Sequence, residues 1–78
     1  MNRKIKVIWD FYGDKSQKTA ERHAEPVAEF MEKHNLPFFE TGTASAADFH
    51  TLSFLTVSEE HVYTVRDALK PQRAFVVE

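Results

Sequence analysis

The sequence contains no cysteine, which excludes a disulfide scaffold, a zinc finger, an iron–sulfur cluster and thiol-based redox catalysis. Any metal ion would have to be held by histidine and carboxylate side chains. The four histidines are too far apart for H-x-H, H-x-x-H or H-x-x-x-H spacing; they are His23, His34, His50 and His61. We therefore expect neither a bound metal nor another cofactor.

Long apolar runs and a large excess of one charge are also missing. The first six residues are basic, like the start of a signal peptide, but Lys6 and Asp10 interrupt the apolar stretch that follows, and it is too short to span a membrane. The 10 basic and 12 acidic residues are spread along the chain and leave a formal net charge of -2. This pattern provides no electrostatic footprint for nucleic acid or an anionic membrane. We expect a cytoplasmic protein that binds neither.

Apolar residues are plentiful for so short a chain. Its 78 residues include seven Phe and one Trp, enough for a hydrophobic core, so intrinsic disorder is excluded. The length predicts a single domain over residues 1–78. A domain of this size buries only about 60% of the surface of its unfolded chain, so a lone monomer would be marginally stable and self-association would help.

The stretch Lys4–Gly13 predicts a buried central strand, because its large side chains alternate with smaller or polar ones. The alternating set that should face the core is Ile5, Val7, Trp9 and Phe11. The side chains between them should face the opposite side of the sheet; they are Lys6, Ile8, Asp10 and Tyr12.

A helix of about five turns is expected next, with Asp14 or Ser16 as its N-cap and residues 34–35 as its end. Its apolar stripe consists of Ala20, Ala24, Val27, Ala28 and Met31. Pro26 interrupts this helix, because it has no N–H to donate to the carbonyl of Arg22. The sequence therefore predicts a kink there, with a new helix beginning at Pro26 as the alternative.

Four further elements complete the chain. They are a short strand at Leu36–Thr41 that begins near Pro37 and is joined by the loop Gly42–Asp48 to a strand at Phe49–Val57, a helix between Ser58 and Lys70, and a strand at Arg73–Val77. The resulting order β-α-β-β-α-β resembles the ferredoxin-like α+β fold. That resemblance implies a four-stranded antiparallel sheet in the order 4-1-3-2 with both helices on one face. The fold hosts many unrelated functions, so it does not identify an activity.

The strand Phe49–Val57 has two possible inward sets. We favour Phe49, Leu55 and Val57 facing the core, because Val57 leads directly into the second helix, although an inward Leu52 and Phe54 competes closely. In the favoured register an apolar open face results, formed by Ile8, Leu52 and Phe54. We expect a homodimer through this face, with a small-molecule ligand contacting the same three residues.

The favoured register also places His50 on the open face with Asp10 and Tyr12, because the first and third strands pair. A histidine beside a carboxylate is a workable general base, so Asp10, Tyr12 and His50 are candidate catalytic residues, although a half-buried surface histidine is the simpler interpretation. The sequence predicts a small homodimeric domain that binds or responds to a small molecule. A small dimeric acid/base enzyme is the alternative, and the sequence leaves open which of the two applies.

Overall fold

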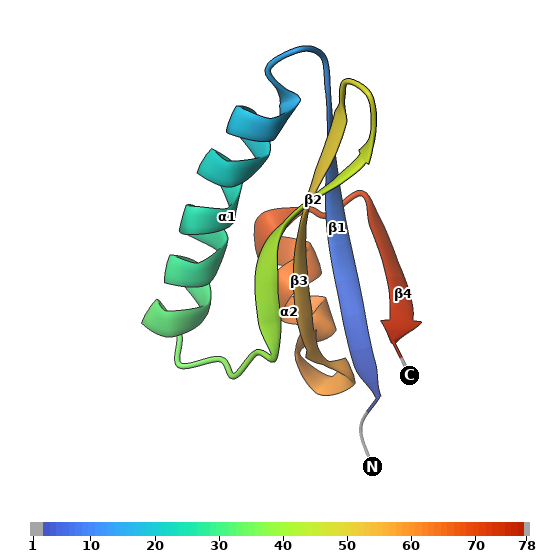
Figure 1. Cartoon of the computed structure of the whole chain (residues 1–78). Coiled ribbons are helices and arrows are strands. Elements are labelled where there is room, and N and C mark those ends of the chain that lie inside the picture. The colour runs from blue at the N-terminus through green and yellow to red at the C-terminus, as the bar shows by residue number, and fades with distance from the viewer. Residues whose placement is uncertain (1–2, 78) are drawn as a thin grey trace.

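The computed structural model describes residues 3–77, which form an α+β fold with one four-stranded antiparallel sheet and two α-helices (Figure 1). In chain order the elements are β1 (Lys4–Tyr12), α1 (Ser16–Lys33), β2 (Glu40–Ala47), β3 (His50–Ser58), the 3-10 turn η1 (Glu59–His61), α2 (Val62–Leu69) and β4 (Arg73–Val77). The strand order is β2-β3-β1-β4, which is the order 4-1-3-2 read from the opposite edge. Of the helices within residues 3–77, none is both long enough and apolar enough to cross a membrane.

The core lies between one face of the sheet and both helices. It is built from Ile5, Val7, Trp9, Val27, Met31, Leu55, Val57 and Val65. Because α1 and α2 both contribute to this one cluster, they cover the same face of the sheet. The predicted alternation of β1 is confirmed for Ile5, Val7 and Trp9, and Phe11 packs partly buried against the cluster. The Trp9 indole N–H also donates to the carbonyl of Leu69 at 2.8 Å, which ties the end of α2 to the central strand.

Helix α1 differs from the prediction at its start, and of the two alternatives at Pro26 it excludes one. It runs without interruption from Ser16 to Lys33, so a separate helix beginning at Pro26 is wrong. Pro26 and Arg22 are both exposed, so the carbonyl that loses its helical partner lies on the solvent side. No side chain caps the helix at its N-cap, Lys15. Ser16 is instead buried, and its hydroxyl lies 3.0 Å from that of Thr51, which fixes the start of α1 on β3.

The second strand is not where the sequence placed it. The predicted strand Leu36–Thr41 and loop Gly42–Asp48 are wrong, because β2 occupies Glu40–Ala47 and only Asp48 and Phe49 separate it from β3. Pairing along β3 satisfies the backbone of these small polar residues and so outweighs their weak strand propensity. The absence of a side chain at Gly42 leaves room for the Phe54 ring on the paired strand, because a Cβ at that position would lie 3.4 Å from the ring.

Strand β3 has the favoured register, but Phe49 does not belong to the core. Leu55 and Val57 are fully buried opposite Val7 and Ile5. Phe49 lies at the hairpin tip, where it has a left-handed φ of 59° and is 67% exposed. Its carbonyl accepts a hydrogen bond from the N–H of Gly13 at 2.8 Å, which anchors the tip to the turn before α1.

Candidate functional site

The predicted grouping of Asp10, Tyr12 and His50 on the open face is found in the structure. The register of β1 and β3 places His50 opposite Tyr12 and two positions along the ladder from the pair Asp10–Leu52, on the same face of the sheet. His50 Nε2 lies 2.8 Å from Asp10 Oδ1. The Tyr12 ring stacks on the imidazole with 4.4 Å between ring centroids and 18° between planes. The three side chains therefore form one cluster at the end of the central strands.

Arg73 completes this cluster and was missed by the sequence analysis. It is the first residue of β4, and its guanidinium donates two hydrogen bonds to Asp10, from Nε to Oδ2 at 2.9 Å and from Nη2 to Oδ1 at 2.8 Å. The neighbouring Gln72 accepts a hydrogen bond from the Asp10 backbone N–H at its Oε1, at 2.7 Å. The Asp10 carboxylate thus connects β1 to β3 through His50 and to β4 through Arg73.

The electrostatics of this cluster keep Asp10 ionised. Its side chain is only 7% exposed, and this burial raises its pKa. The hydrogen bonds from His50 and Arg73, together with the positive charge of Arg73, outweigh burial and lower the pKa of Asp10 below its usual 3.8. The Asp10 carboxylate orients the His50 ring. Both of its oxygens, however, also accept hydrogen bonds from the Arg73 guanidinium.

The three expected ligand-contacting residues lie on the open face but are largely covered by their own neighbours. Ile8 is only 3% exposed, and Leu52 is half-buried. Phe54 lies between Gly42 on one side and the Lys6 ammonium, 4.3 Å from its ring centroid, on another. A long basic side chain can cover apolar surface in this way while its charge stays in water.

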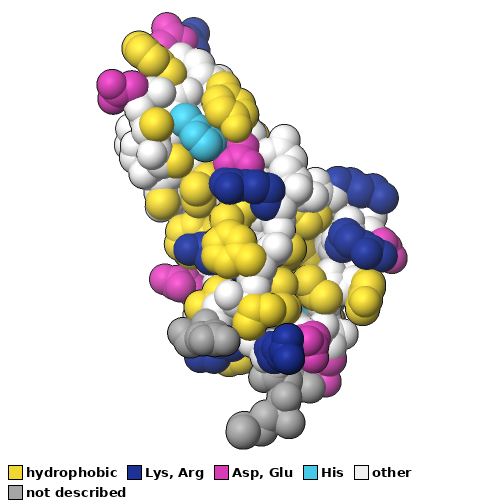
Figure 2. Space-filling model, turned by 90° about the vertical axis from the view of Figure 1, so that its right-hand side faces the viewer, with side chains coloured by type: hydrophobic (Ala, Val, Ile, Leu, Met, Phe, Trp, Pro, Cys, Tyr) yellow, Lys and Arg dark blue, Asp and Glu magenta, His cyan; other side chains and the backbone are white. Residues whose placement is uncertain are grey.

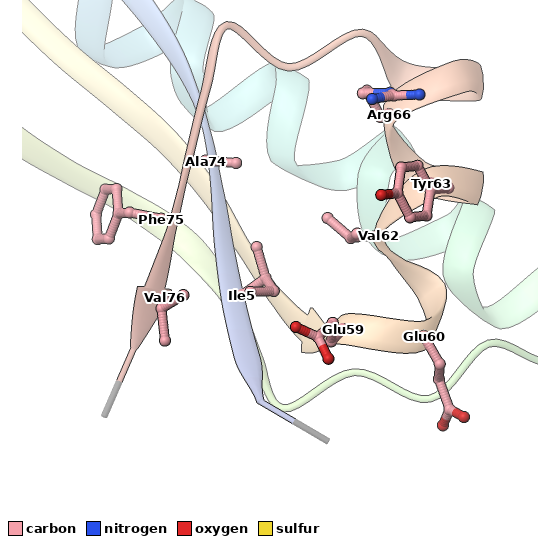
Figure 3. A pocket seen from close by; sticks show the side chains of 9 residues that line it. All are labelled: Ile5, Glu59, Glu60, Val62, Tyr63, Arg66, Ala74, Phe75 and Val76. Atoms are coloured by element: carbon pink, nitrogen blue, oxygen red, sulfur yellow. The ribbon is translucent and has the colours of Figure 1, made fainter. Parts of the chain in front are cut away.

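A groove lies elsewhere, between α2 and β4 on the helix side of the sheet (Figure 3). Its volume is about 680 Å³. It exists because β4 stands at the uncovered edge of the sheet and is exposed along almost its whole length (Figure 1). The apolar and aromatic residues that line it are Ile5 from β1, Val62 and Tyr63 from the helix, and Ala74, Phe75 and Val76 from β4. The Phe75 side chain points to the side of β4 opposite α2 (Figure 3).

The two ends of this groove carry opposite charges. Glu59 directly follows Ser58, which pairs with Lys4, and Lys4 also pairs with Val77, so Glu59 marks the end of the groove where β4 finishes. Arg66 lies at the end where β4 begins, where it also lines a second hollow of about 200 Å³. Figure 3 shows Glu59 and Arg66 at opposite ends of the groove. The groove is therefore apolar along its walls and polarised along its length.

Both charged groups are accessible to a ligand. The Arg66 side chain is 62% exposed; its guanidinium lies 4.8 Å from the centre of the Tyr63 ring and 3.6 Å from an oxygen of Asp67. Glu59 is exposed and forms no ion pair with any residue between 3 and 77. Neither Glu59 nor Arg66 is predicted as a site residue from the sequence, because the groove depends on how far α2 reaches over the sheet.

His23 is a half-buried titratable group on the other face of the sheet from Asp10. It projects from α1 onto the rings of Trp9 and Phe11, with ring centroids 4.8 and 5.4 Å away. Its Nε2 is buried without a hydrogen-bond partner among the described residues. Burial lowers the pKa of His23 below 6.5, so the ring is neutral at pH 7 and contributes to packing.

No known protein family, curated protein or solved structure matches this chain. Two features of the structure could support a function, the open-face cluster and the groove. The groove has room for a ligand beside two accessible charges, whereas the Asp10 carboxylate of the cluster is satisfied by its own protein neighbours.

Proposed function

We propose that this chain is a small cytoplasmic domain of the ferredoxin-like type that binds a small amphipathic molecule, or is regulated by one, in the groove between α2 and β4. The observation that carries the proposal is the groove itself, whose volume of about 680 Å³ is within the range of about 300–1,000 Å³ typical of ligand sites. The ferredoxin-like assignment is supported by the element order and by the strand order β2-β3-β1-β4.

The lining of the groove defines the chemistry of the ligand. Ile5, Val62 and Val76 favour an apolar body. Arg66 favours a carboxylate or another planar anion, because a guanidinium donates two parallel hydrogen bonds to such a group. The groove is open to solvent along β4, so we expect modest affinity and rapid exchange.

Octanoate is a suitable probe because it combines a carboxylate with an apolar chain. Titrated into isotope-labelled protein, it should shift the methyl NMR signals of Ile5 and Val62. Val76→Lys should abolish these shifts by placing a charge on the groove wall, whereas Ala46→Lys, at an exposed position on the opposite edge strand, should leave them unchanged. Shifts centred on Leu52 instead would place the ligand on the open face and overturn the proposal.

We also propose that the domain forms a homodimer through the open sheet face, as its sequence predicts. Tyr12 and Phe75 on that face are exposed, and Leu52 and Phe54 are half-buried, so association would remove apolar surface from water. Sedimentation at micromolar concentration should give a dimer for the natural chain and a 9.0 kDa monomer for Phe54→Lys. A natural chain that sediments only as a monomer would contradict this interface.

An acid/base enzyme is the second candidate, and the 2.8 Å contact between His50 and Asp10 favours it. The bidentate contact of Arg73 with the same carboxylate argues for a structural role instead. Hydrolysis of p-nitrophenyl acetate distinguishes the two. The binding proposal predicts equal rates for the natural chain and His50→Gln, whereas a rate above background that is lost in His50→Gln and in Asp10→Asn would support the enzyme.

A further inference from the structure

We propose that the ligand of the groove is a linear ω-amino carboxylate, a molecule with an ammonium group at one end of an apolar chain and a carboxylate at the other. Its ammonium lies at Glu59, its carboxylate at Arg66 and its chain along α2. This inference rests on the proposed function, in that it takes the groove to be a ligand site, and it specifies the class of the ligand and its direction. It follows from the spacing of the two charged residues along one helical face and from the apolar lining between them.

One face of the helical segment formed by η1 and α2 lines the groove. Four residues at positions i, i+3, i+4 and i+7 of this segment border it: Glu59, Val62, Tyr63 and Arg66. This spacing places side chains on one side of a helix, one above another. Glu59 and Arg66 are the first and the last residue of this face, and Figure 3 shows them at opposite ends of the groove. Both charges therefore border the space between α2 and the sheet.

The lining between the two charges is apolar. Ile5 and Val76 lie across the groove from Val62 (Figure 3), and placing an alkyl chain against them removes apolar surface from water. Figure 2 views the molecule from the side of β4 and shows hydrophobic side chains gathered between charged ones. An alkyl chain is therefore favoured between the two charged ends of the ligand.

Both charged residues can form an ion pair with a ligand. Glu59 is exposed and pairs with no residue between 3 and 77, whereas the Glu60 side chain extends away from the groove (Figure 3) and lies 3.5 Å from His61. Arg66 Nε is 3.6 Å from Asp67, which is too long for a hydrogen bond, so the guanidinium can donate two hydrogen bonds to a ligand carboxylate. A ligand in the reverse direction would place like charges together at both ends. The charges therefore select one direction.

The separation of the two charged residues sets the length of the ligand. Glu59 and Arg66 are seven residues apart, which corresponds to about 11–12 Å along a segment that begins as a 3-10 turn and continues as an α-helix. Hydrogen bonds of about 2.8 Å at both ends shorten the distance required between the ligand's charges to roughly 6 Å where they lie along the groove. An extended chain advances about 1.2 Å per single bond, so five to nine bonds between the amino nitrogen and the carboxyl carbon span this range. An α-amino acid has only two such bonds and is too short to reach both groups.

The matched probes are 8-aminooctanoate and octanoate, which differ only in the terminal ammonium. Titrated into isotope-labelled protein at low ionic strength, both should shift the methyl NMR signals of Ile5 and Val62. The amino form should bind about two- to fivefold more tightly, because it adds an exposed ion pair with Glu59. Octanedioate and 1,8-diaminooctane have the same chain length but place a like charge at Glu59 or at Arg66, so both should bind more weakly than 8-aminooctanoate. Glycine, a zwitterion without the chain, should cause no methyl shifts at the same concentration.

Charge variants assign each end of the ligand, and both positions are exposed, so the substitutions leave the core intact. Glu59→Gln should remove the advantage of 8-aminooctanoate and change the affinity for octanoate by less than about twofold, because the octanoate carboxylate lies at the other end. Arg66→Gln should weaken both probes by the same factor, about two- to fivefold, because both carry the carboxylate. The matched controls are Glu21→Gln and Arg22→Gln, which remove the same charges from exposed positions on α1 and should leave both affinities unchanged.

Binding of octanoate with no preference for 8-aminooctanoate would retain the groove as a ligand site and overturn the inference of an ω-amino carboxylate. A preference that survives Glu59→Gln, or tighter binding of octanedioate than of 8-aminooctanoate, would overturn it as well. Binding of neither matched probe would overturn the proposed function too. A preference that is lost in Glu59→Gln, together with an equal loss of affinity for both probes in Arg66→Gln, would establish the class of the ligand and its direction.

Discussion

Asp10→Ala should destabilise the domain through the loss of a single acceptor that connects three strands. The nearly buried carboxylate accepts hydrogen bonds from His50 and twice from Arg73. A hydrogen bond to a charged group contributes about 1.5–3 kcal/mol, but the Arg73 side chain is half exposed, so we assign at most about 1 kcal/mol to its pair. We therefore expect the free energy of unfolding to fall by about 2–3 kcal/mol, equivalent to a Tm lower by roughly 10–20 °C for a domain of this size.

Urea unfolding monitored by tryptophan fluorescence measures this change, because Trp9 is the only Trp in the chain and is buried. Asp14→Ala is the matched control, since Asp14 is exposed and forms no ion pair within residues 3–77. Arg73→Ala completes a double-mutant cycle with Asp10→Ala. A loss below about 0.5 kcal/mol for Asp10→Ala, or strictly additive effects of the two substitutions, would refute the idea that the cluster joins the strands.

The same stabilisation should depend on pH in a defined direction. The pKa of Asp10 is lower in the folded chain than its usual 3.8, so the unfolded chain takes up this proton first as the pH falls. The contribution is complete above about pH 4 and is lost as the pH falls through the folded pKa. The difference in stability between the natural chain and Asp10→Ala should therefore be constant near neutrality and shrink in strongly acidic solution.

Two further predictions concern α1. Because burial lowers the pKa of His23 below 6.5, the unfolded chain binds this proton more readily, and stability should decline as the pH falls below 6.5. His23→Leu should remove that part of the decline in urea titrations between pH 7 and 5, and an identical decline in the variant would contradict the burial argument. Pro26→Ala should raise the free energy of unfolding by about 1–2 kcal/mol, because it restores a backbone hydrogen-bond donor inside a continuous helix. The substitution also makes the unfolded chain more flexible, which lowers stability, but by less than the restored donor raises it. A lower urea midpoint for Pro26→Ala would contradict this reasoning.

The sequence by itself determined the central strand and the core side of the first helix. The alternation of Ile5, Val7 and Trp9 and the helical spacing of Val27 and Met31 are local patterns, and their large apolar side chains must leave water wherever the chain folds. The proximity of His50 to Asp10 was also predictable, because it follows from pairing of the first and third strands together with the parity of β3.

The composition of β3 hardly indicates which of its alternating side chains face the core. The inward positions Thr51 and Ser53 are more polar than the outward Leu52 and Phe54, yet the former are buried. Leu55 and Val57 decide the matter, because they must join the core against which α1 packs and a strand cannot change face without a bulge. The Ser53 hydroxyl is left without a partner among the described residues, which shows that placing this strand outweighs satisfying that group.

Only the tertiary structure decided where the second strand lies, that Arg73 contacts Asp10, and that a groove forms. Strand β2 consists mainly of Ala, Thr, Gly and Ser, which are held in place by their pairing with β3, and its sequence has no local pattern typical of a strand. Arg73 reaches Asp10 only because the register of β4 sets it opposite Ile8. The groove exists because α2 is eight residues long and leaves β4 uncovered. Register and coverage arise from contacts between residues distant in the chain, so they are settled only when the whole domain assembles.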